Sequence, residues 1–61
     1  MDKEYLRKQY HQAVLEFKTA ISEDAQWQAR EQMARIERTA LELFGDDFVQ
    51  EIRTENGLEE Y

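Results

Sequence analysis

Two sets of apolar residues recur at steps of three and four along this 61-residue chain, and one helix-start signal separates them. The sets are Leu6, Tyr10, Ala13, Phe17 and Ala20, then Ala29, Met33, Ile36, Ala40 and Leu43. Steps of this size place each set on one face of a helix. Ser22, followed by Glu23 and Asp24, is a typical helix start. The pattern predicts an antiparallel hairpin, because so short a connection makes consecutive helices neighbours.

The capping residues set the expected bounds of the two helices. The first is expected over residues 3–21 after Asp2, and the second over residues 23–44 after Ser22. Their apolar faces are widened by Val14, Ile21, Trp27, Ala34 and Leu41. One helix continuing through Ser22 is the alternative, because no glycine or proline enforces a break there. The capping signature favours the break.

A short third helix is expected after the second. Gly45 is typical of the residue that follows a helix, and Asp46 or Asp47 can cap the next one. The apolar edge of the third helix consists of Phe48, Val49 and Ile52. This helix is expected to end near Thr54. Whether Gly45 breaks the second helix or only bends it stays open.

The sequence predicts one helical domain over residues 1–54 and an acidic tail over residues 55–61. Asn56-Gly57 marks the end of the third helix, and the chain from Leu58 onward is expected to fray. A chain of this length buries only about 60% of the surface that it exposes when unfolded. A partner surface is a common remedy for so small a core.

The predicted fold class is all-α, with the hairpin and short third helix assembling as a homodimeric four-helix bundle. In a symmetric dimer the same patch serves both chains. The residues expected in the core or the interface are Leu6, Tyr10, Ala13, Val14, Phe17, Ile21, Trp27, Met33, Ile36, Ala40, Leu41, Leu43 and Phe44. Trp27 is expected to cover the end of the bundle, with an anchor for another protein as the alternative. A higher oligomer stays open.

The composition gives little support to catalysis or to a cofactor. The chain has no cysteine and a single histidine, His11, so thiolate sites are excluded and the usual histidine-rich zinc site is not expected. It carries no glycine-rich phosphate loop and no nucleophile motif. Asp46, Asp47 and Glu51 could hold a cation, but helix capping explains them without a metal. We therefore expect no enzyme, no cofactor and no metal.

Charge is distributed unevenly along the chain. Residues 1–21 carry a net charge of +1, residues 22–44 carry −2 and residues 45–61 carry −5, which together give −6. Such a balance disfavours broad nucleic-acid binding, because phosphate contacts need a basic surface. No apolar segment has the pattern of a signal peptide or the length to span a bilayer, so the protein is expected to be soluble and cytoplasmic.

A second surface is predicted on the side of the first helix that faces away from its apolar stripe. It comprises Tyr5, Lys8, His11, Gln12 and Leu15. Isolated exposed apolar residues are normal, and His11 is expected to be solvated. A face that binds a heterologous partner is the alternative interpretation of these residues.

The segment Phe44-Gly45-Asp46-Asp47 follows a long amphipathic helix. It resembles the end of the second helix in ROP-type hairpins, which pair into antiparallel four-helix bundles. ROP-type proteins bind paired RNA loops through an outer face, and the matching segment is not the part that carries that activity. The resemblance therefore implies a hairpin shape, and no functional residue is transferred from it.

Three functions are compatible with these observations. The one favoured is a small acidic helical regulator or adaptor that binds an unidentified protein partner. The alternative is RNA binding through the basic face of the first helix in a dimer, with Lys3, Arg7, Lys8 and Lys18. The third is mimicry of nucleic acid by the acidic C-terminal third.

Overall fold

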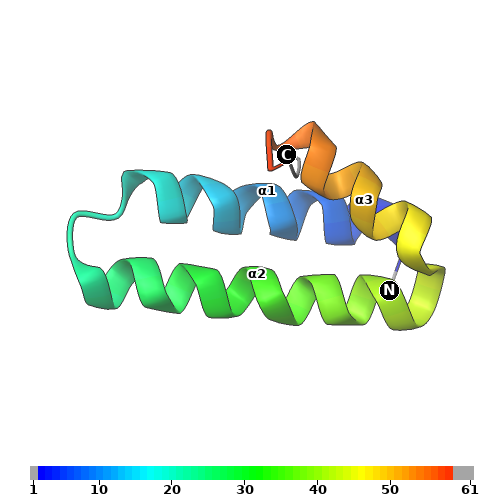
Figure 1. The fold of residues 1–61 in the computed structure, drawn as a ribbon, viewed down its shortest axis with the longest axis horizontal. Helices are drawn as coiled ribbons and strands as arrows, with labels where there is room; N and C mark the ends of the chain where they lie inside the picture. Colours follow the sequence, from blue (N-terminus) through cyan, green and yellow to red (C-terminus); the bar gives the residue numbers. More distant parts are fainter. Residues whose placement is uncertain (1, 59–61) are drawn as a thin grey trace.

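The computed structural model describes residues 2–58, which form three helices and no strand. Helix α1 spans Lys3–Thr19, α2 spans Glu23–Phe44 and α3 spans Asp46–Glu55. Helices α1 and α2 run antiparallel, and α3 folds back beside the N-terminal part of α1 (Figure 1). The all-α prediction is confirmed, and the bounds of the second helix agree with those expected.

Side-chain caps start the first two helices. The Oδ1 atom of Asp2 accepts from the backbone N–H of Tyr5 at 2.8 Å, and the Oγ atom of Ser22 accepts from that of Ala25 at 3.1 Å. Both caps satisfy amides that have no partner within the helix. Ser22 has an extended backbone, so the chain does not continue as one helix through this residue.

The first helix ends at Thr19, two residues earlier than predicted. Ala20 adopts an extended backbone, and the chain then reaches the extended cap Ser22 through Ile21. Residues 20–22 provide the reversal that an antiparallel hairpin needs, so Ile21 cannot take part in the helical stripe. Its side chain is fully exposed.

Gly45 ends α2 and directly precedes α3. Its φ of 91° lies in the region that favours glycine, and its N–H donates to the carbonyls of Ala40 (3.2 Å) and Leu41 (3.0 Å). The residue therefore breaks the second helix. The expectation that Asp46 or Asp47 is the N-cap is wrong, because α3 begins immediately after the glycine. Both aspartates lie in the first turn of α3, where a negative charge interacts favourably with the positive end of the helix dipole.

The end of α3 is a Schellman motif. The N–H of Gly57 donates to the carbonyl of Thr54 at 3.0 Å, and that of Leu58 donates to the carbonyl of Arg53 at 2.8 Å. Gly57 has a φ of 73°, and Leu58 packs against the core. The predicted fraying is therefore wrong at Leu58. The other residues of that expected segment, 59–61, lie outside the described part of the chain.

The core lies at the end of the hairpin opposite the turn. Its buried members are Leu6, Tyr10, Val14, Ala40, Phe48, Val49 and Ile52. All three helices contribute to it, and it is flanked by Met33, Ile36, Phe44 and Leu58. We call this part, formed by residues 2–14 and 33–58, the three-helix half. Residues 15–32, where α1 and α2 continue without α3 (Figure 1), are the turn half.

Candidate functional site

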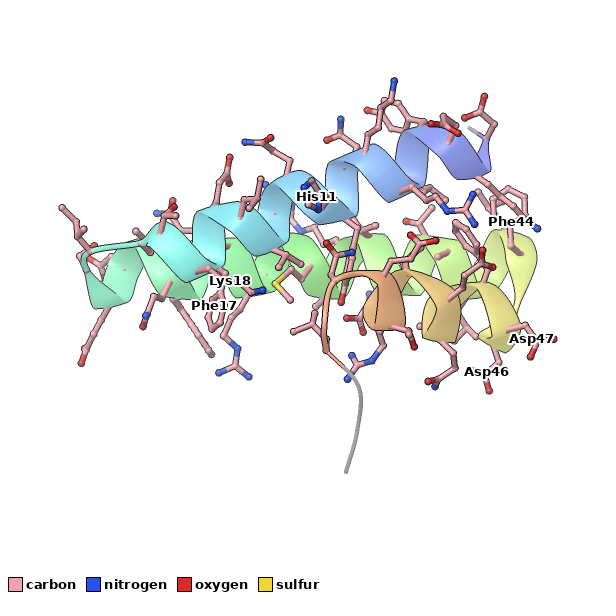
Figure 2. The ribbon with its side chains drawn as sticks, turned by 90° about the horizontal axis from the view of Figure 1, so that it is seen from above. His11, Phe17, Lys18, Phe44, Asp46 and Asp47 are labelled. Carbon is pink, nitrogen blue, oxygen red and sulfur yellow. The ribbon has the colours of Figure 1, made fainter. Side chains whose placement is uncertain are left out.

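The turn half contains an open groove of about 440 Å³, here called the turn-half groove. Its lining residues are Phe17, Glu23, Asp24, Gln26, Trp27 and Arg30. The Trp27 side chain is 62% exposed, and the Arg30 guanidinium lies 5.9 Å from the centre of the Trp27 ring. Figure 2 shows Phe17 and its neighbour Lys18 on the side of the hairpin where α3 lies. The groove therefore lies on the same side of the hairpin as α3, between α3 and the turn.

A second, smaller hollow of about 250 Å³ connects this groove to the edge of α3. It is lined by Arg30, Met33, Ala34, Glu37 and Arg53. Arg30 belongs to both linings, so the two hollows are neighbours along α2. A ligand in the turn-half groove would lie next to α3 and would share Arg30 with the connecting hollow.

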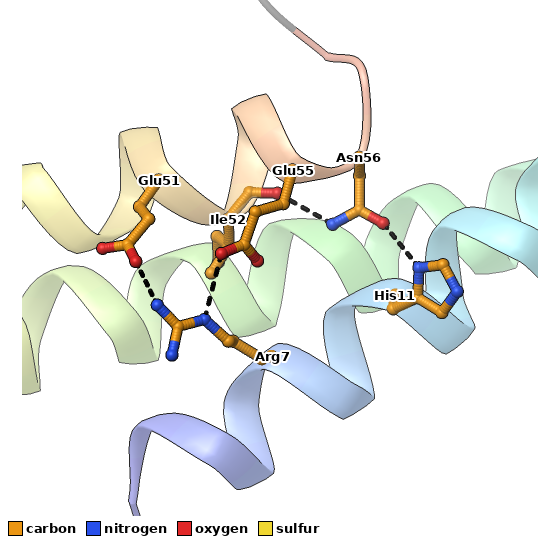
Figure 3. Close-up of polar contacts among 6 residues, drawn as sticks. All are labelled: Arg7, His11, Glu51, Ile52, Glu55 and Asn56. Carbon is orange, nitrogen blue, oxygen red and sulfur yellow. Dashed lines mark hydrogen bonds and ion pairs between the residues drawn. The ribbon is translucent and has the colours of Figure 1, made fainter.

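In the three-helix half, Arg7 joins α1 to α3. Its Nη2 atom donates to a carboxylate oxygen of Glu51, and its Nε atom donates to Glu55 at 3.2 Å (Figure 3). Desolvation lowers the pKa of the guanidinium, but the two carboxylates raise it more, so the Arg7 pKa lies above its ordinary value. The arginine and both glutamates are partly exposed. This arrangement orients α3 on α1.

A second polar cluster joins the other edge of α3 to α2. The hydroxyl of Tyr10 donates to the Oε2 atom of Glu37 at 2.5 Å, and Arg53 donates to the same oxygen from 3.1 Å. Burial raises the pKa of the Tyr10 phenol, and the hydrogen bond to Glu37 raises it further. Tyr10 is fully buried, and this bond gives its polar atom a partner.

His11 also contacts α3, which the sequence did not predict. Its Nδ1 atom lies 2.8 Å from the Oδ1 atom of Asn56, and Asn56 donates through Nδ2 to the carbonyl of Ile52 at 2.8 Å (Figure 3). The amide oxygen can only accept, so Nδ1 of the histidine is the donor. His11 therefore helps to hold the C-terminal end of α3.

The basic face proposed for RNA binding is partly engaged within the chain. The Nζ atom of Lys3 lies 5.4 Å from the ring centre of Phe44 and 5.5 Å from that of Phe48. Arg7 also lies 5.5 Å from the Phe48 ring. Both cations lie against aromatic rings on either side of the turn at Gly45, where they stabilise the position of α3.

The predicted core and interface residues fall into three groups. Leu6, Tyr10, Ala13, Val14 and Ala40 are buried. Phe17, Met33, Ile36 and Phe44 are partly buried. Ile21, Trp27, Leu41 and Leu43 are exposed. Trp27 lies at the edge of the turn-half groove, and Leu41 is half exposed on α2.

The two edges of the predicted partner face border different helices. Tyr5 lines a shallow hollow of about 190 Å³ between α1 and α2, together with Ile36 and Thr39. His11 faces α3 instead, where Asn56 occupies its Nδ1 atom. The remaining members are exposed: Lys8, Gln12 and Leu15. All five residues are exposed, so they share one side of α1. The use of this face by a partner stays a prediction.

Sequence reasoning missed the polar residues that hold α3 in place. They are Glu37, Glu51, Arg53, Glu55 and Asn56. One signal was present, because Glu51 and Glu55 are four residues apart and lie on one edge of a helix. The side chain that they would face could not be known before the direction of α3 was known.

The described residues contain no cluster of three or more potential metal ligands. None of the helices in residues 2–58 combines the length and apolar character needed to cross a bilayer. Comparison with protein-family models, curated proteins and solved structures found no match to this chain.

Proposed function

We propose that this protein acts by binding another protein, as a small regulator or adaptor, and that the turn-half groove is the surface it uses. The observation that carries the proposal is the difference between the two halves of the hairpin. In one half α3 covers the apolar face, while in the other Phe17 and Trp27 line an open groove. Tryptophan beside apolar and charged groups is a common anchor in protein interfaces.

Catalysis and nucleic-acid mimicry are less well supported by the same contacts. The Nδ1 atom of His11 is engaged by Asn56, and Tyr10 donates to Glu37, so both groups hold the fold together. Glu51 and Glu55 face Arg7, which neutralises part of the acidic surface that a mimic would present. RNA binding is weakened in turn, because Arg7 is occupied by these carboxylates.

A homodimer is proposed on a separate observation. Trp27, Ala34 and Leu41 recur every seven residues on the exposed side of α2, and this spacing is typical of a seam between helices. Glu31 and Arg38 lie along the same side, so two copies of α2 packed antiparallel would place each glutamate near the partner's arginine. The sequence along this face is therefore self-complementary in charge.

Sedimentation at several concentrations tests the dimer. We expect the mass to rise with concentration for the natural chain, and the change Leu41→Glu to abolish that rise. Leu15→Glu is the matched control, because Leu15 is exposed on α1. A monomeric mass at every concentration would remove the dimer from the proposal, while leaving the turn-half groove unaffected.

Affinity capture from the cell of origin tests the binding of another protein. The natural chain is compared with Trp27→Ala, which alters the groove, and with Tyr5→Ala, which removes an exposed aromatic group elsewhere. A partner that is retained by the natural chain and by Tyr5→Ala, but lost with Trp27→Ala, supports the proposal. A partner retained equally by all three would contradict the assignment of the groove.

A further inference from the structure

Helix α1 repeats the same pair of residue types after eleven positions. Leu6 and Arg7 stand in the three-helix half, and Phe17 and Lys18 stand in the turn half. Eleven residues correspond to about three turns of an α-helix, so the second pair has nearly the same orientation as the first, roughly 16 Å farther along. Figure 2 shows Phe17 and Lys18 on the side of the hairpin where α3 lies.

Helix α2 shows the same repeat in the opposite direction, as its antiparallel course requires. Ala40 is fully buried, and Ala29, eleven residues earlier, is 3% exposed. Phe44 and Met33 are also separated by eleven residues, and both are partly buried. Small residues therefore bring the two helices together at two levels, with a larger apolar residue beside each. The hairpin presents two similar docking positions, one in each half.

Helix α3 shows what the first docking position binds. Its apolar side chains Phe48, Val49 and Ile52 are buried in the core. The edge of α3 nearer α1 carries Glu51 and Glu55, which bind Arg7. Its other edge carries Arg53, which binds Glu37 on α2. The occupant is thus an amphipathic helix with a carboxylate edge toward α1 and a guanidinium edge toward α2.

The second position repeats the basic residue of α1. Lys18 on α1 takes the place of Arg7, three turns farther along. On the α2 side Glu23 and Asp24 line the groove near the turn, and Arg30 lines it at the end next to the connecting hollow. Eleven residues before Glu37 the chain has Gln26, and eleven residues before Leu41 it has Arg30. A basic residue on α1 is therefore present at both positions, whereas the acidic Glu37 of α2 has no counterpart at the second position.

We propose that the turn-half groove binds an amphipathic helix of another protein, with the pattern of α3. That helix would place two apolar residues side by side and a third one turn later, with carboxylates four residues apart facing Lys18. Insertion of an amphipathic helix into an apolar groove is a recurring mode of recognition. The inference rests on the proposed function and specifies the class of partner that the groove accepts.

A peptide with the sequence of residues 46–58, held helical by a side-chain bridge on its exposed face, serves as the probe. It is titrated into the isotopically labelled full chain, and amide and indole shifts are followed by NMR. We expect saturable shifts at Phe17, Trp27 and Arg30, with little change around Ile52. Absence of shifts in the groove at millimolar peptide, or shifts confined to the three-helix half, would overturn the proposal.

Charge reversal tests the orientation of the bound helix. Lys18→Glu should weaken binding about fivefold, which is the order expected for exposed ion pairs. A peptide in which both Glu51 and Glu55 are replaced by lysine should bind the natural chain weakly. Its affinity should be restored when it is titrated into the Lys18→Glu chain. Lys8→Glu is the matched control and should leave binding unchanged. Equal binding of both peptides to the natural chain would overturn the charge assignment.

A concentration series without peptide identifies the competing occupant. The series uses the Leu41→Glu chain, in which the proposed dimer through α2 is abolished. If the Phe17 and Arg30 resonances of that chain still move as the protein alone is concentrated, a second copy fills the groove and the proposal is wrong. If the peptide fails while affinity capture still depends on Trp27, the groove binds a protein of another shape. In that case the proposed function survives and the amphipathic-helix assignment does not.

Discussion

The three-helix half and the turn half are built from the same two helices and differ in what covers them. In the first, α3 packs on the pair, and Leu6, Tyr10 and Ile52 are almost completely buried. In the second, Ile21 is fully exposed and Trp27 lies at the edge of an open groove. The difference teaches that the apolar stripes of this hairpin extend well beyond the part that its own third helix can cover.

This contrast also predicts where the folding free energy is concentrated. A small domain has few buried side chains, and here most of them belong to one cluster. Regions with few buried apolar contacts open at a lower free energy than the core. The turn half should therefore tolerate substitution better, which leaves its surface available for binding.

The largest effect is expected at the centre of the three-helix half. Ile52→Ala should lower the free energy of unfolding by about 3 kcal/mol, because it leaves a cavity around a fully buried side chain. Urea denaturation followed by circular dichroism measures this loss. Leu15→Ala, at an exposed apolar position, is the control and should change stability by less than about 0.5 kcal/mol. Equal losses would remove the distinction between core and surface.

The next effect is expected at the reversal that brings α3 onto the hairpin. Gly45→Ala should lower the free energy of unfolding by about 2 kcal/mol, since alanine is strained at a φ of 91°. Apart from Gly45 and its two neighbours in the chain, no atom lies within 4 Å of an added Cβ, so the cost comes from the backbone conformation. Asp46→Ala is the neighbouring control and should cost less than about 1 kcal/mol. An unchanged denaturation midpoint for Gly45→Ala would contradict the observed turn.

A smaller effect is expected at the hydrogen bond between α1 and α2 beneath α3. Tyr10→Phe should cost about 1 kcal/mol, because the donor to Glu37 is lost while Arg53 still binds that carboxylate. Stability of the natural chain should also fall as the pH rises above the ordinary tyrosine pKa of 10.0, since the fold raises the Tyr10 pKa and disfavours the phenolate.

Denaturation of the two chains between pH 8 and about pH 11 measures both parts of this prediction. The loss of stability above the ordinary tyrosine pKa should be weaker in Tyr10→Phe than in the natural chain. Parallel curves would show that Tyr10 does not contribute to the alkaline transition.

The smallest effect on stability is expected in the turn half. Trp27→Ala should change the free energy of unfolding by less than about 0.5 kcal/mol, because most of the side chain is exposed. The same change should remove partner binding. Trp27→Ala would then affect binding without affecting the free energy of unfolding. A loss comparable to that of Ile52→Ala would mean that Trp27 belongs to the core.

Much of the helical pattern could be predicted from local signals. The second helix was predicted over the observed residues because Ser22 and Gly45 mark its two ends clearly. The end of the first helix was placed too late, because Ile21 matches the apolar period although the chain must already reverse there. The packing of Leu58 could not be predicted either, since its contact with the core depends on where α3 packs.

The candidate site was predicted only in part. Trp27 was identified as an anchor or a cover from its residue type and position, but the groove beside it depends on how far α3 extends along the hairpin. The pairing of Arg7 with Glu51 joins residues 44 positions apart, and no local pattern determines such a contact. Long-range placement, rather than helix propensity, was the missing information.

Amide hydrogen exchange at low protein concentration tests the contrast between the two halves most directly. The strongest protection is expected for amides around Tyr10, Ala40 and Ile52, and clearly faster exchange is expected between Phe17 and Arg30. The first-turn amides of each helix are left out of the comparison, because they have no hydrogen-bond acceptor within the helix. Uniform protection along α1 and α2 would contradict this, because it would show that the hairpin is equally stable with and without α3 beside it.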